Sequence, residues 1–302
     1  MSKTTAPKER YLLVHFTGES AEGEQVYFSV SQDGFYWNDL NNGQPVLRSE
    51  IGEKGVRDPF IIRSKEGDRF FIIATDLRIA NGKGWSVAQH SGSRAIIVWE
   101  SEDLIHWQKE RSCEVGIPEA GCVWAPEAVY DEERDAYMVF WASMVSEKHR
   151  IYCSYTKDFR TFSEPQTYIE RSNSVIDTTI IYDGGMFYRF SKDETTKTIR
   201  MDAGPKLQGE FREIHSEILM HMMGLEGPAA FPLPDGKGWC LMVDRFAEGK
   251  GYLPLVCCSL QDGDFKTVPE DTYHLGENRK RHGSVLALTE EEYQKLLQKW
   301  GK

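Results

Sequence analysis

Three acidic residues occupy matching places in segments that repeat along this chain of 302 residues. Asp58, Asp177 and Glu226 each stand at the start of an apolar, strand-like stretch, and His282 stands at the start of another. Carboxyl groups that converge raise one another's pKa, so one can stay protonated while another is ionised. Such a set is suited to general acid–base chemistry. Any one of these acids alone more often caps a turn, and it is their shared position that favours a joint role.

The segments that carry these residues share one plan, an apolar strand, a polar turn and a second apolar–aromatic strand. Their matching positions are Asp58, Ala125, Asp177, Glu226 and His282, with separations of 67, 52, 49 and 56 residues. These separations are close to the length of one blade of a β-propeller. Because the innermost strands of a propeller line its axis, the pattern predicts that the side chains meet at one mouth of the ring.

A second kind of segment alternates with the first and ends in a turn of the type Ser-x-Asp-x-x-x-Trp. It occurs at residues 31–37 and 101–107, with looser copies at 155–162, 204–211 and 259–265. With five segments of each kind, the sequence predicts an all-β fold with five blades.

The order of the segments predicts how the ring closes. The chain begins with an outer segment and ends with an inner one, so strands around residues 11–16 and 25–37 are expected to complete the blade begun after His282. This pairing would remove the free edges of an open sheet. We therefore predict a single five-bladed β-propeller catalytic domain over residues 1–302, with a short carboxyl-terminal helix over 290–300 packed by one face on the propeller.

The inner segments resemble those of glycoside hydrolase family 43, inverting five-bladed propellers that act on arabinose- and xylose-containing glycans. In chain order, the matching motifs are Arg57-Asp58-Pro59-Phe60-Ile61, Val123-Trp124-Ala125-Pro126-Glu127, Ile176-Asp177-Thr178-Thr179, Leu225-Glu226-Gly227-Pro228 and Arg281-His282-Gly283-Ser284-Val285. Each motif is weak alone. Together, in the family's order and over nearly the whole chain, they are specific.

The resemblance implies a role for each of the three acids. Asp58 would be the ionised general base that takes a proton from water as the water attacks the anomeric carbon. Glu226 would be the general acid, kept protonated, that gives a proton to the leaving oxygen. Asp177 would hold up the pKa of this acid and orient it. Inversion needs room for the water, so the carboxyl groups of Asp58 and Glu226 are expected ~6.5–9.5 Å apart rather than ~5–5.5 Å.

Four further residues are candidates for contacts to the sugar. Trp124 stands in register with the mouth of the ring, and Trp85 lies in a glycine-containing loop that would reach its rim. Glu127 stands where many relatives have Asp or His, and it either contacts a sugar hydroxyl or caps its strand, the structural role being slightly favoured. Arg245 either binds substrate hydroxyls or forms a surface ion pair.

The predicted reaction requires no cofactor. The resemblance implies that His282 lies near a water-coordinated calcium or sodium ion on the axis, although a lone histidine on an inner strand is more often a hydrogen-bonded core residue. No Asp-x-Asp-x-Asp-Gly loop in the sequence demands such an ion.

The resemblance leaves the substrate open between two related sugars. We expect removal of terminal α-L-arabinofuranosyl residues from arabino-oligosaccharides or arabinoxylan fragments, with an exo-acting β-D-xylosidase as the alternative. A retaining, fructan-cleaving propeller is disfavoured because the chain has neither an Asn-Asp-Pro-Asn-Gly nor a Glu-Cys string. A non-catalytic sugar-binding propeller is the alternative of another class, and the presence of all three acids argues against it.

Composition limits the partners. With 36 Lys and Arg against 47 Asp and Glu, the net charge is 36 − 47 = −11, which disfavours nucleic acid as a partner. No apolar run approaches the ~20 residues of a membrane-spanning helix. The six cysteines include no Cys-x-x-Cys pair and are expected to be reduced. The first ten residues are polar, so we expect a cytoplasmic protein that acts on oligosaccharides, with its oligomeric state open.

Overall fold

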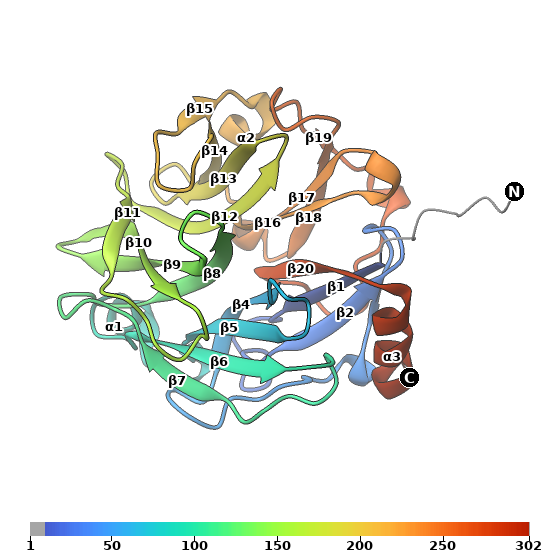
Figure 1. Ribbon diagram of the computed structural model, residues 1–302, viewed down its shortest axis with the longest axis horizontal. Helices are drawn as coiled ribbons and strands as arrows, with labels where there is room; N and C mark the ends of the chain where they lie inside the picture. Colours follow the sequence, from blue (N-terminus) through green and yellow to red (C-terminus); the bar gives the residue numbers. More distant parts are fainter. Residues whose placement is uncertain (1–9, 302) are drawn as a thin grey trace, which may run out of the picture.

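Five four-stranded antiparallel sheets surround a common axis in the computed structural model, which describes residues 10–301 (Figure 1). In each sheet the strands follow one another outward from the axis, so each sheet is one blade. The innermost strands touch in a closed circle, β4 to β8, β12, β16, β20 and back to β4. The predicted five-bladed β-propeller is therefore confirmed.

Three blades are built from consecutive strands in the first two thirds of the chain. From the axis outward they are β4 (Val56–Arg63), β5 (Phe70–Asp76), β6 (Ala95–Ser101) and β7 (Arg111–Glu114); β8 (Trp124–Asp131), β9 (Ala136–Val145), β10 (Lys148–Thr156) and β11 (Gln166–Ile169); and β12 (Val175–Asp183), β13 (Met186–Asp193), β14 (Thr198–Gly204) and β15 (Arg212–Ile214).

The fourth blade is again built from consecutive strands, whereas the fifth combines strands from the two ends of the described chain. They are β16 (Glu226–Pro232), β17 (Trp239–Asp244), β18 (Tyr252–Cys257) and β19 (Lys266–Thr267); and β20 (Gly283–Leu288), β1 (Arg10–His15), β2 (Tyr27–Ser31) and β3 (Trp37–Asp39). In the final blade β20 pairs with β1, from Arg10 opposite Leu288 to His15 opposite Gly283. The predicted closure by the two ends of the described chain is confirmed.

The hydrophobic core is divided among the contacts between blades. Each of five buried clusters joins two neighbouring blades; for example, Phe71 and Ile73 of one blade pack with Tyr137 and Val139 of the next. The middle strand β5 is buried along its whole length, because its two faces contact two neighbouring blades. Continuous apolar strands are the expected result of burial on both faces.

The repeated turn joins the third and fourth strands of each blade. In its first copy, Ser31 Oγ accepts a hydrogen bond from Gly34 N at 2.9 Å, and Asp33 Oδ1 accepts one from Phe35 N at 2.8 Å. Trp37 Nε1 donates to Gly34 O at 3.0 Å and fills the space beneath. Serine, aspartate and tryptophan recur at these positions because each satisfies or covers the same part of the turn.

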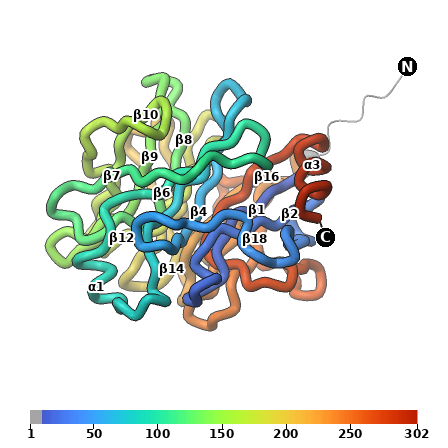
Figure 2. The backbone as a smooth tube through the Cα atoms, turned by 90° about the horizontal axis from the view of Figure 1, so that it is seen from below, coloured from blue at the N-terminus to red at the C-terminus, as the bar shows by residue number. Residues whose placement is uncertain are grey.

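The helix α3 (Glu290–Trp300) lies against the closing blade, beside the carboxyl end of the described chain (Figure 2). Its capping box is complete, since Thr289 accepts from Glu292 N while the Glu292 side chain accepts from Thr289 N. Tyr293 and Leu296 are buried in the cluster between this blade and the next. The predicted packing by one face is confirmed.

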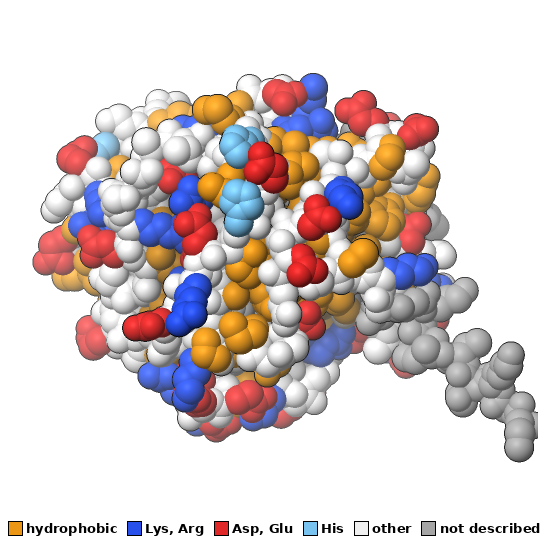
Figure 3. Space-filling view, turned by 90° about the horizontal axis from the view of Figure 1, so that it is seen from above, with side chains coloured by type: hydrophobic (Ala, Val, Ile, Leu, Met, Phe, Trp, Pro, Cys, Tyr) orange, Lys and Arg blue, Asp and Glu red, His pale blue; other side chains and the backbone are white. Residues whose placement is uncertain are grey.

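The molecular surface carries charges of both signs. On the face shown in Figure 3, acidic and basic side chains are interspersed with apolar ones, and the described residues form no continuous basic patch there.

None of the described helices combines the length and the apolar character that crossing a bilayer needs. The six cysteines are all free thiols, as expected. Residues 1–9, on which the localisation prediction depends, lie outside the described part of the chain.

Candidate active site

Bulges in four inner strands aim side chains into the axis. The pairing of each inner strand with its neighbour shifts register at this point, and the backbone has a positive φ at Asp58 (50°), Ala125 (47°), Asp177 (47°) and Gly227 (55°). For residues other than glycine this conformation costs about 1–2 kcal/mol. Bulges and left-handed residues of this kind concentrate beside active sites, where they redirect side chains.

The bulges also correct the predicted register of the fourth repeat. The residue equivalent to Asp58 and Asp177 is Gly227, and Glu226 lies one position earlier. A Cβ atom on Gly227 would approach the His282 ring to 2.5 Å, so glycine is needed there and no acid can occupy the position. The predicted match of Glu226 with Asp58 and Asp177 is therefore wrong by one residue, because the His282 ring that requires glycine comes from a distant part of the sequence.

With the corrected register, each inner strand contributes a residue to a common wall. The residues immediately before the matched positions all line one pocket, and we call them the upper ring: Arg57, Trp124, Ile176, Glu226 and Arg281. Asp58 and Asp177 reach the same pocket from the next position. The structure thus brings the three predicted acids together.

The pocket has a volume of about 300 Å³, which is at the small end of the range for ligand sites. Trp85 and Phe246 add aromatic walls from outside the inner strands, and Lys192 and Glu194 add charge from the third blade. The result is a hollow with both flat apolar surfaces and hydrogen-bonding groups, as a sugar ring requires.

Asp58 is held by two partners on opposite sides. Its Oδ2 accepts a hydrogen bond from Thr75 Oγ1 at 3.0 Å, and its Oδ1 lies 3.3 Å from His282 Nδ1. Burial raises the pKa of Asp58, but His282, Arg57 and Thr75 together outweigh it, so this pKa lies below its usual value. Asp58 is therefore ionised at neutral pH, as a general base must be.

Asp177 lies near the same nitrogen of His282 as Asp58, with its Oδ2 4.0 Å from Nδ1. Burial, assisted by the charges of Glu226 and Asp58 and opposed by His282, raises the pKa of Asp177 to about 6. The same Oδ2 accepts a hydrogen bond from Gly227 N at 3.1 Å. Asp177 consequently fixes the backbone next to Glu226.

Glu226 is bound by a cation on each carboxylate oxygen. Lys192 Nζ lies 2.9 Å from Oε2, and Arg281 Nη2 lies 2.7 Å from Oε1. Burial raises the pKa of Glu226, but Lys192 and Arg281 outweigh it and bring the pKa below its usual value. In the free pocket Glu226 is therefore ionised, which differs from the expectation of an acid that is kept protonated.

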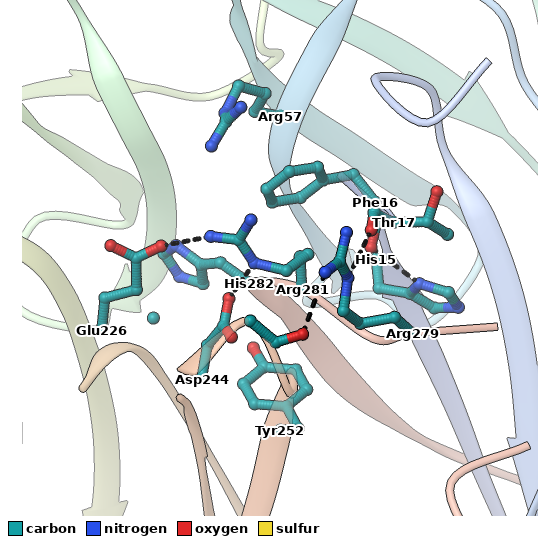
Figure 4. Close-up of polar contacts among 12 residues, drawn as sticks. His15, Phe16, Thr17, Arg57, Glu226, Asp244, Tyr252, Arg279, Arg281 and His282 are labelled. Carbon is teal, nitrogen blue, oxygen red and sulfur yellow. Dashed lines mark hydrogen bonds and ion pairs between the residues drawn. The ribbon is translucent and has the colours of Figure 1, made fainter. Parts of the chain in front are cut away.

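Arg281 is itself fixed from behind. Its Nε donates to Asp244, whose side chain is fully buried, so one guanidinium joins two carboxylates (Figure 4). The Phe16 ring packs against this guanidinium and that of Arg57, with its centroid 5.2 Å from Arg281 and 4.5 Å from Arg57. Figure 4 shows both guanidinium groups on the side of Phe16 that faces Glu226.

The two predicted aromatic contacts, Trp124 and Trp85, meet at the pocket. Their rings are 6.0 Å apart and nearly perpendicular, at 83°. Trp124 stacks on His149, while Trp85 belongs to α1 (Gly84–His90) and has an exposed fraction of 41%. The loop before α1 is anchored by the buried carboxylate of Glu24, which accepts hydrogen bonds from two of its backbone N–H groups.

Glu127 does not reach the pocket. Its side chain is buried beneath the floor, and burial raises its pKa to about 8, with His282 opposing and Asp177 adding to the effect. Its burial outside the pocket lining favours a structural role over a contact to a sugar hydroxyl.

Arg245 also lies outside the pocket lining. Its guanidinium is 3.8 Å from the exposed carboxylate of Glu270, so the ion-paired alternative describes it better than a substrate contact. The chain turns away after β17, through a 3-10 turn at Phe246–Glu248, and presents Phe246 to the pocket instead.

The axial residues do not fit a directly coordinated metal ion. Within residues 10–301, no group of three or more His, Cys, Asp or Glu side chains is arranged to hold one. His282 instead faces Asp58 and Asp177, and these carboxylates raise its pKa to about 9 against the opposing effect of burial. The imidazolium supplies a positive charge where an ion was expected, and a water-coordinated calcium or sodium ion stays a prediction.

Several residues of the pocket wall were not predicted from the sequence. Lys192 and Glu194 lie near the end of β13, the second strand of a blade, and no inner-strand motif points to them. Arg57 and Arg281 stood within the motifs but were given no role. A search for charged residues one position before each matched inner-strand residue would have found both arginines.

The fold and this pocket define a class of protein, propellers that hold acid–base groups around a hollow of the size of a sugar. Comparison with known families agrees, since the family described as "Probable glycosyl hydrolase domain", which is related to glycoside hydrolase family 43, matches residues 6–294. The chain belongs to this family. The sequence-based prediction of a glycosidase related to family 43 is thereby confirmed.

Individual relatives support the same placement. An α-L-arabinofuranosidase of Bifidobacterium longum subsp. longum is 35% identical over 213 residues, which cover 63% of this chain and 20% of that protein. The chain thus matches about a fifth of the length of this relative.

Solved structures share the fold at low identity. An α-L-arabinanase of Cellvibrio cellulosa is 14% identical, with a TM-score of 0.61 over 92% of this chain and 97% of that one. A family-43 β-1,3-galactosidase bound to galactodeoxynojirimycin is 12% identical, with a TM-score of 0.62 over 90% and 93%.

Proposed function

We propose that this protein is an inverting glycosidase that removes terminal α-L-arabinofuranosyl residues from arabino-oligosaccharides or arabinoxylan fragments. The observation that carries the proposal is the convergence of Asp58, Asp177 and Glu226 on one small pocket with aromatic walls. The sugar is suggested by the name of the Bifidobacterium longum relative. Because arabinanase and galactosidase structures share the fold, the sugar must be tested directly.

In this proposal Asp58 acts as the general base. Its carboxylate is ionised and fixed by Thr75 and His282, so it can take a proton from a water that attacks the anomeric carbon. Preorganised partners of this kind spare the base any rearrangement during the reaction.

Glu226, on a different inner strand from Asp58, acts as the general acid, and Asp177 supports it. The carboxyl proton of Glu226 passes to the glycosidic oxygen while the bond from this oxygen to the anomeric carbon breaks. Asp177 holds the Gly227 backbone and adds negative charge near Glu226, which favours the protonated form of the acid. Proton loss from Asp58 and proton uptake by Glu226 then return the pair to the protonation state that reacts.

The walls of the pocket favour action at chain ends. Trp85, Trp124 and Phe246 bound a volume of about 300 Å³ on several sides, which suits one terminal sugar better than the interior of a polymer. Flat aromatic faces offer apolar contact to a sugar ring, while the charged groups orient its hydroxyls.

Hydrolysis of aryl glycosides tests the proposal. Release of p-nitrophenol is measured with the α-L-arabinofuranoside, the β-D-xyloside and the β-D-galactoside, using wild type and Glu226→Ala. The arabinofuranoside is expected to react fastest, and Glu226→Ala to lose most of the activity. A faster reaction with the xyloside would establish the alternative, β-D-xylosidase. Absence of turnover with every glycoside, together with measurable sugar binding, would support a sugar-binding propeller instead.

A further inference from the structure

The predicted acid lies at the centre of a row of five alternating charges. Glu194 Oε2 is 2.8 Å from Lys192 Nζ, which is 2.9 Å from Glu226 Oε2. Glu226 Oε1 is 2.7 Å from Arg281 Nη2, and Arg281 Nε contacts Asp244. We call these five residues the acid row.

The charge of the acid row depends on the proton of Glu226. With Glu226 ionised, three carboxylates face two cations, and the row carries one negative charge. With Glu226 protonated, Lys192 still faces Glu194 and Arg281 still faces Asp244, so two complete ion pairs remain. The row can therefore accept a proton at its centre without leaving a buried cation unpaired, which would be costly.

We propose that Glu194 is a positioning residue that holds Lys192 when Glu226 carries its proton, and so lets Glu226 serve as the acid. This inference rests on the proposed function. Lys192 Nζ already contacts both carboxylates, and its side chain is only 3% exposed, so it can pass from one to the other without a backbone movement. Asp244 holds Arg281 in the same way, and because the Asp244 side chain is fully buried, the ion pair between Arg281 and Asp244 is fixed.

The neighbours of the acid row support this division. Glu194 is held in place by Lys197, which binds its second oxygen, and this pairing leaves Oε2 directed at Lys192. His149 also faces Glu194 and has a pKa lowered to about 4, chiefly by burial, so it is neutral at neutral pH. The Phe246 ring lies 4.1 Å from Lys192 Nζ.

Outside the acid row, Glu226 has two further charged neighbours. The positive charge of Arg57 favours its ionised form, and the negative charge of Asp177 favours its protonated form. Asp177 also acts on Lys192 through its charge, but among the described residues only Glu194 and Glu226 form ion pairs with Lys192. Substitution of Glu194 therefore removes one of these two ion pairs and leaves Asp177 unchanged.

The experiment compares two leaving groups over a range of pH. In Glu194→Gln Lys192 loses one of the two carboxylates that contact it, so more of its charge acts on Glu226. The alkaline limb of kcat/KM is expected to move to lower pH by about one unit, so that activity at pH values above the limb falls about tenfold. Substrates with a poor, alkyl leaving group should lose this activity. The 2,4-dinitrophenyl glycoside should lose less than about twofold, because its leaving group needs no proton.

Lys192→Gln gives the opposite shift and serves as the internal check. Removal of the cation favours protonated Glu226, so the alkaline limb should move to higher pH. Both carboxylates keep one cation in this variant, Glu226 through Arg281 and Glu194 through Lys197, which favours a folded protein. Glu213→Gln is the matched control, because Glu213 pairs with Arg200 on the outer strands of the same blade.

The outcomes separate this inference from the proposed function. Opposite shifts in Glu194→Gln and Lys192→Gln, with Glu213→Gln like wild type, would support the positioning role. An equal loss on both leaving groups, a rise in KM with an unmoved limb, or shifts in the same direction would overturn it. If Glu226→Gln leaves activity on alkyl leaving groups intact, it is the proposed function that fails.

Discussion

Two groups of charged side chains share the pocket of this propeller, and they pair their charges differently. Around the predicted base, one imidazolium, His282, is shared by Asp58 and Asp177. Around the predicted acid, Glu226 is bound by two cations, and each of these has a second carboxylate behind it. Burial raises the pKa of every one of these carboxyl groups, so the distribution of cations decides which of them bind a proton.

The groups around the predicted base and the predicted acid have different roles in the proposed reaction. The base needs a stable negative charge, and a fixed hydroxyl and imidazolium supply the partners that maintain it. The acid must gain and lose a proton in each cycle, and the acid row allows both states. The predictions below test this difference by removing one partner at a time.

The largest effect is expected from Asp58→Asn. Loss of the base should lower kcat by about 10²–10⁴-fold with every leaving group, because water must be activated whichever group departs. Glu226→Gln should instead recover most of its activity on a 2,4-dinitrophenyl glycoside. Steady-state kinetics with both leaving groups make the measurement. A leaving-group dependence in Asp58→Asn like that of Glu226→Gln would contradict the assignment.

A smaller loss is expected from Asp177→Asn. Without this negative charge the pKa of Glu226 should fall further, and the alkaline limb of the pH–rate profile should move to lower pH by about one unit. The asparagine can still accept the hydrogen bond from Gly227 N, so the variant should stay folded. The profile of kcat/KM against pH measures the shift, and an unmoved limb would show that Asp177 does not modulate the acid.

Thr75→Val probes the base group more mildly. The Thr75 hydroxyl donates to Asp58 and accepts from Ala125 N at 2.8 Å, so it ties the base to the neighbouring blade. Loss of about 1 kcal/mol of hydrogen bonding should reduce kcat/KM about fivefold. Thr75→Ser, which keeps the hydroxyl, is the control and should remain within about twofold of wild type. Equal losses in the two variants would mean that packing of the methyl group is responsible.

The smallest effect on activity, and a clear effect on stability, is expected from Glu127→Gln. The pKa of buried Glu127 is about 8 in the folded protein, above its ordinary value of 4.5, so the folded state binds its proton more tightly than the unfolded state. Glu127 therefore costs stability as the pH rises from about 4.5 to 8. The pKa of His282 is raised to about 9, so His282 likewise lowers the stability of the folded protein as the pH rises from about 6.5 to 9.

The measurement for Glu127→Gln is thermal unfolding at pH 5 and pH 8. Wild type should lose Tm between these values, and the variant should lose at least about 2 °C less, since glutamine cannot ionise. Thermal unfolding of the two proteins in parallel at equal ionic strength provides the comparison. Identical losses would show that Glu127 is not buried in its protonated form.

The blade plan of this protein could be predicted from sequence because each repeat contains its own local signal. The Ser-x-Asp-x-x-x-Trp turn makes its hydrogen bonds within seven residues, so its pattern can be seen in the amino-acid sequence. The order of inner and outer segments also sufficed to predict closure of the ring by β1 and β20.

The site could be predicted only in part, because its charges are paired across blades. Lys192 and Glu226 come from different blades, and no local pattern relates them. The one-residue error at Gly227 has the same origin, since the reason for glycine is the His282 ring from another inner strand. Glu127 was proposed from its place in the second motif and Arg245 from its place just after a strand, and neither residue lines the pocket.

The central claim is that Asp58 and Glu226 act on opposite sides of one sugar, with a water between the base and the anomeric carbon. Proton NMR of the first sugar released from an aryl α-L-arabinofuranoside tests it most directly, before mutarotation mixes the anomers. The account predicts that β-L-arabinofuranose appears first, which is the product of inversion. Initial release of the α-anomer would show retention and would contradict the roles assigned to both residues.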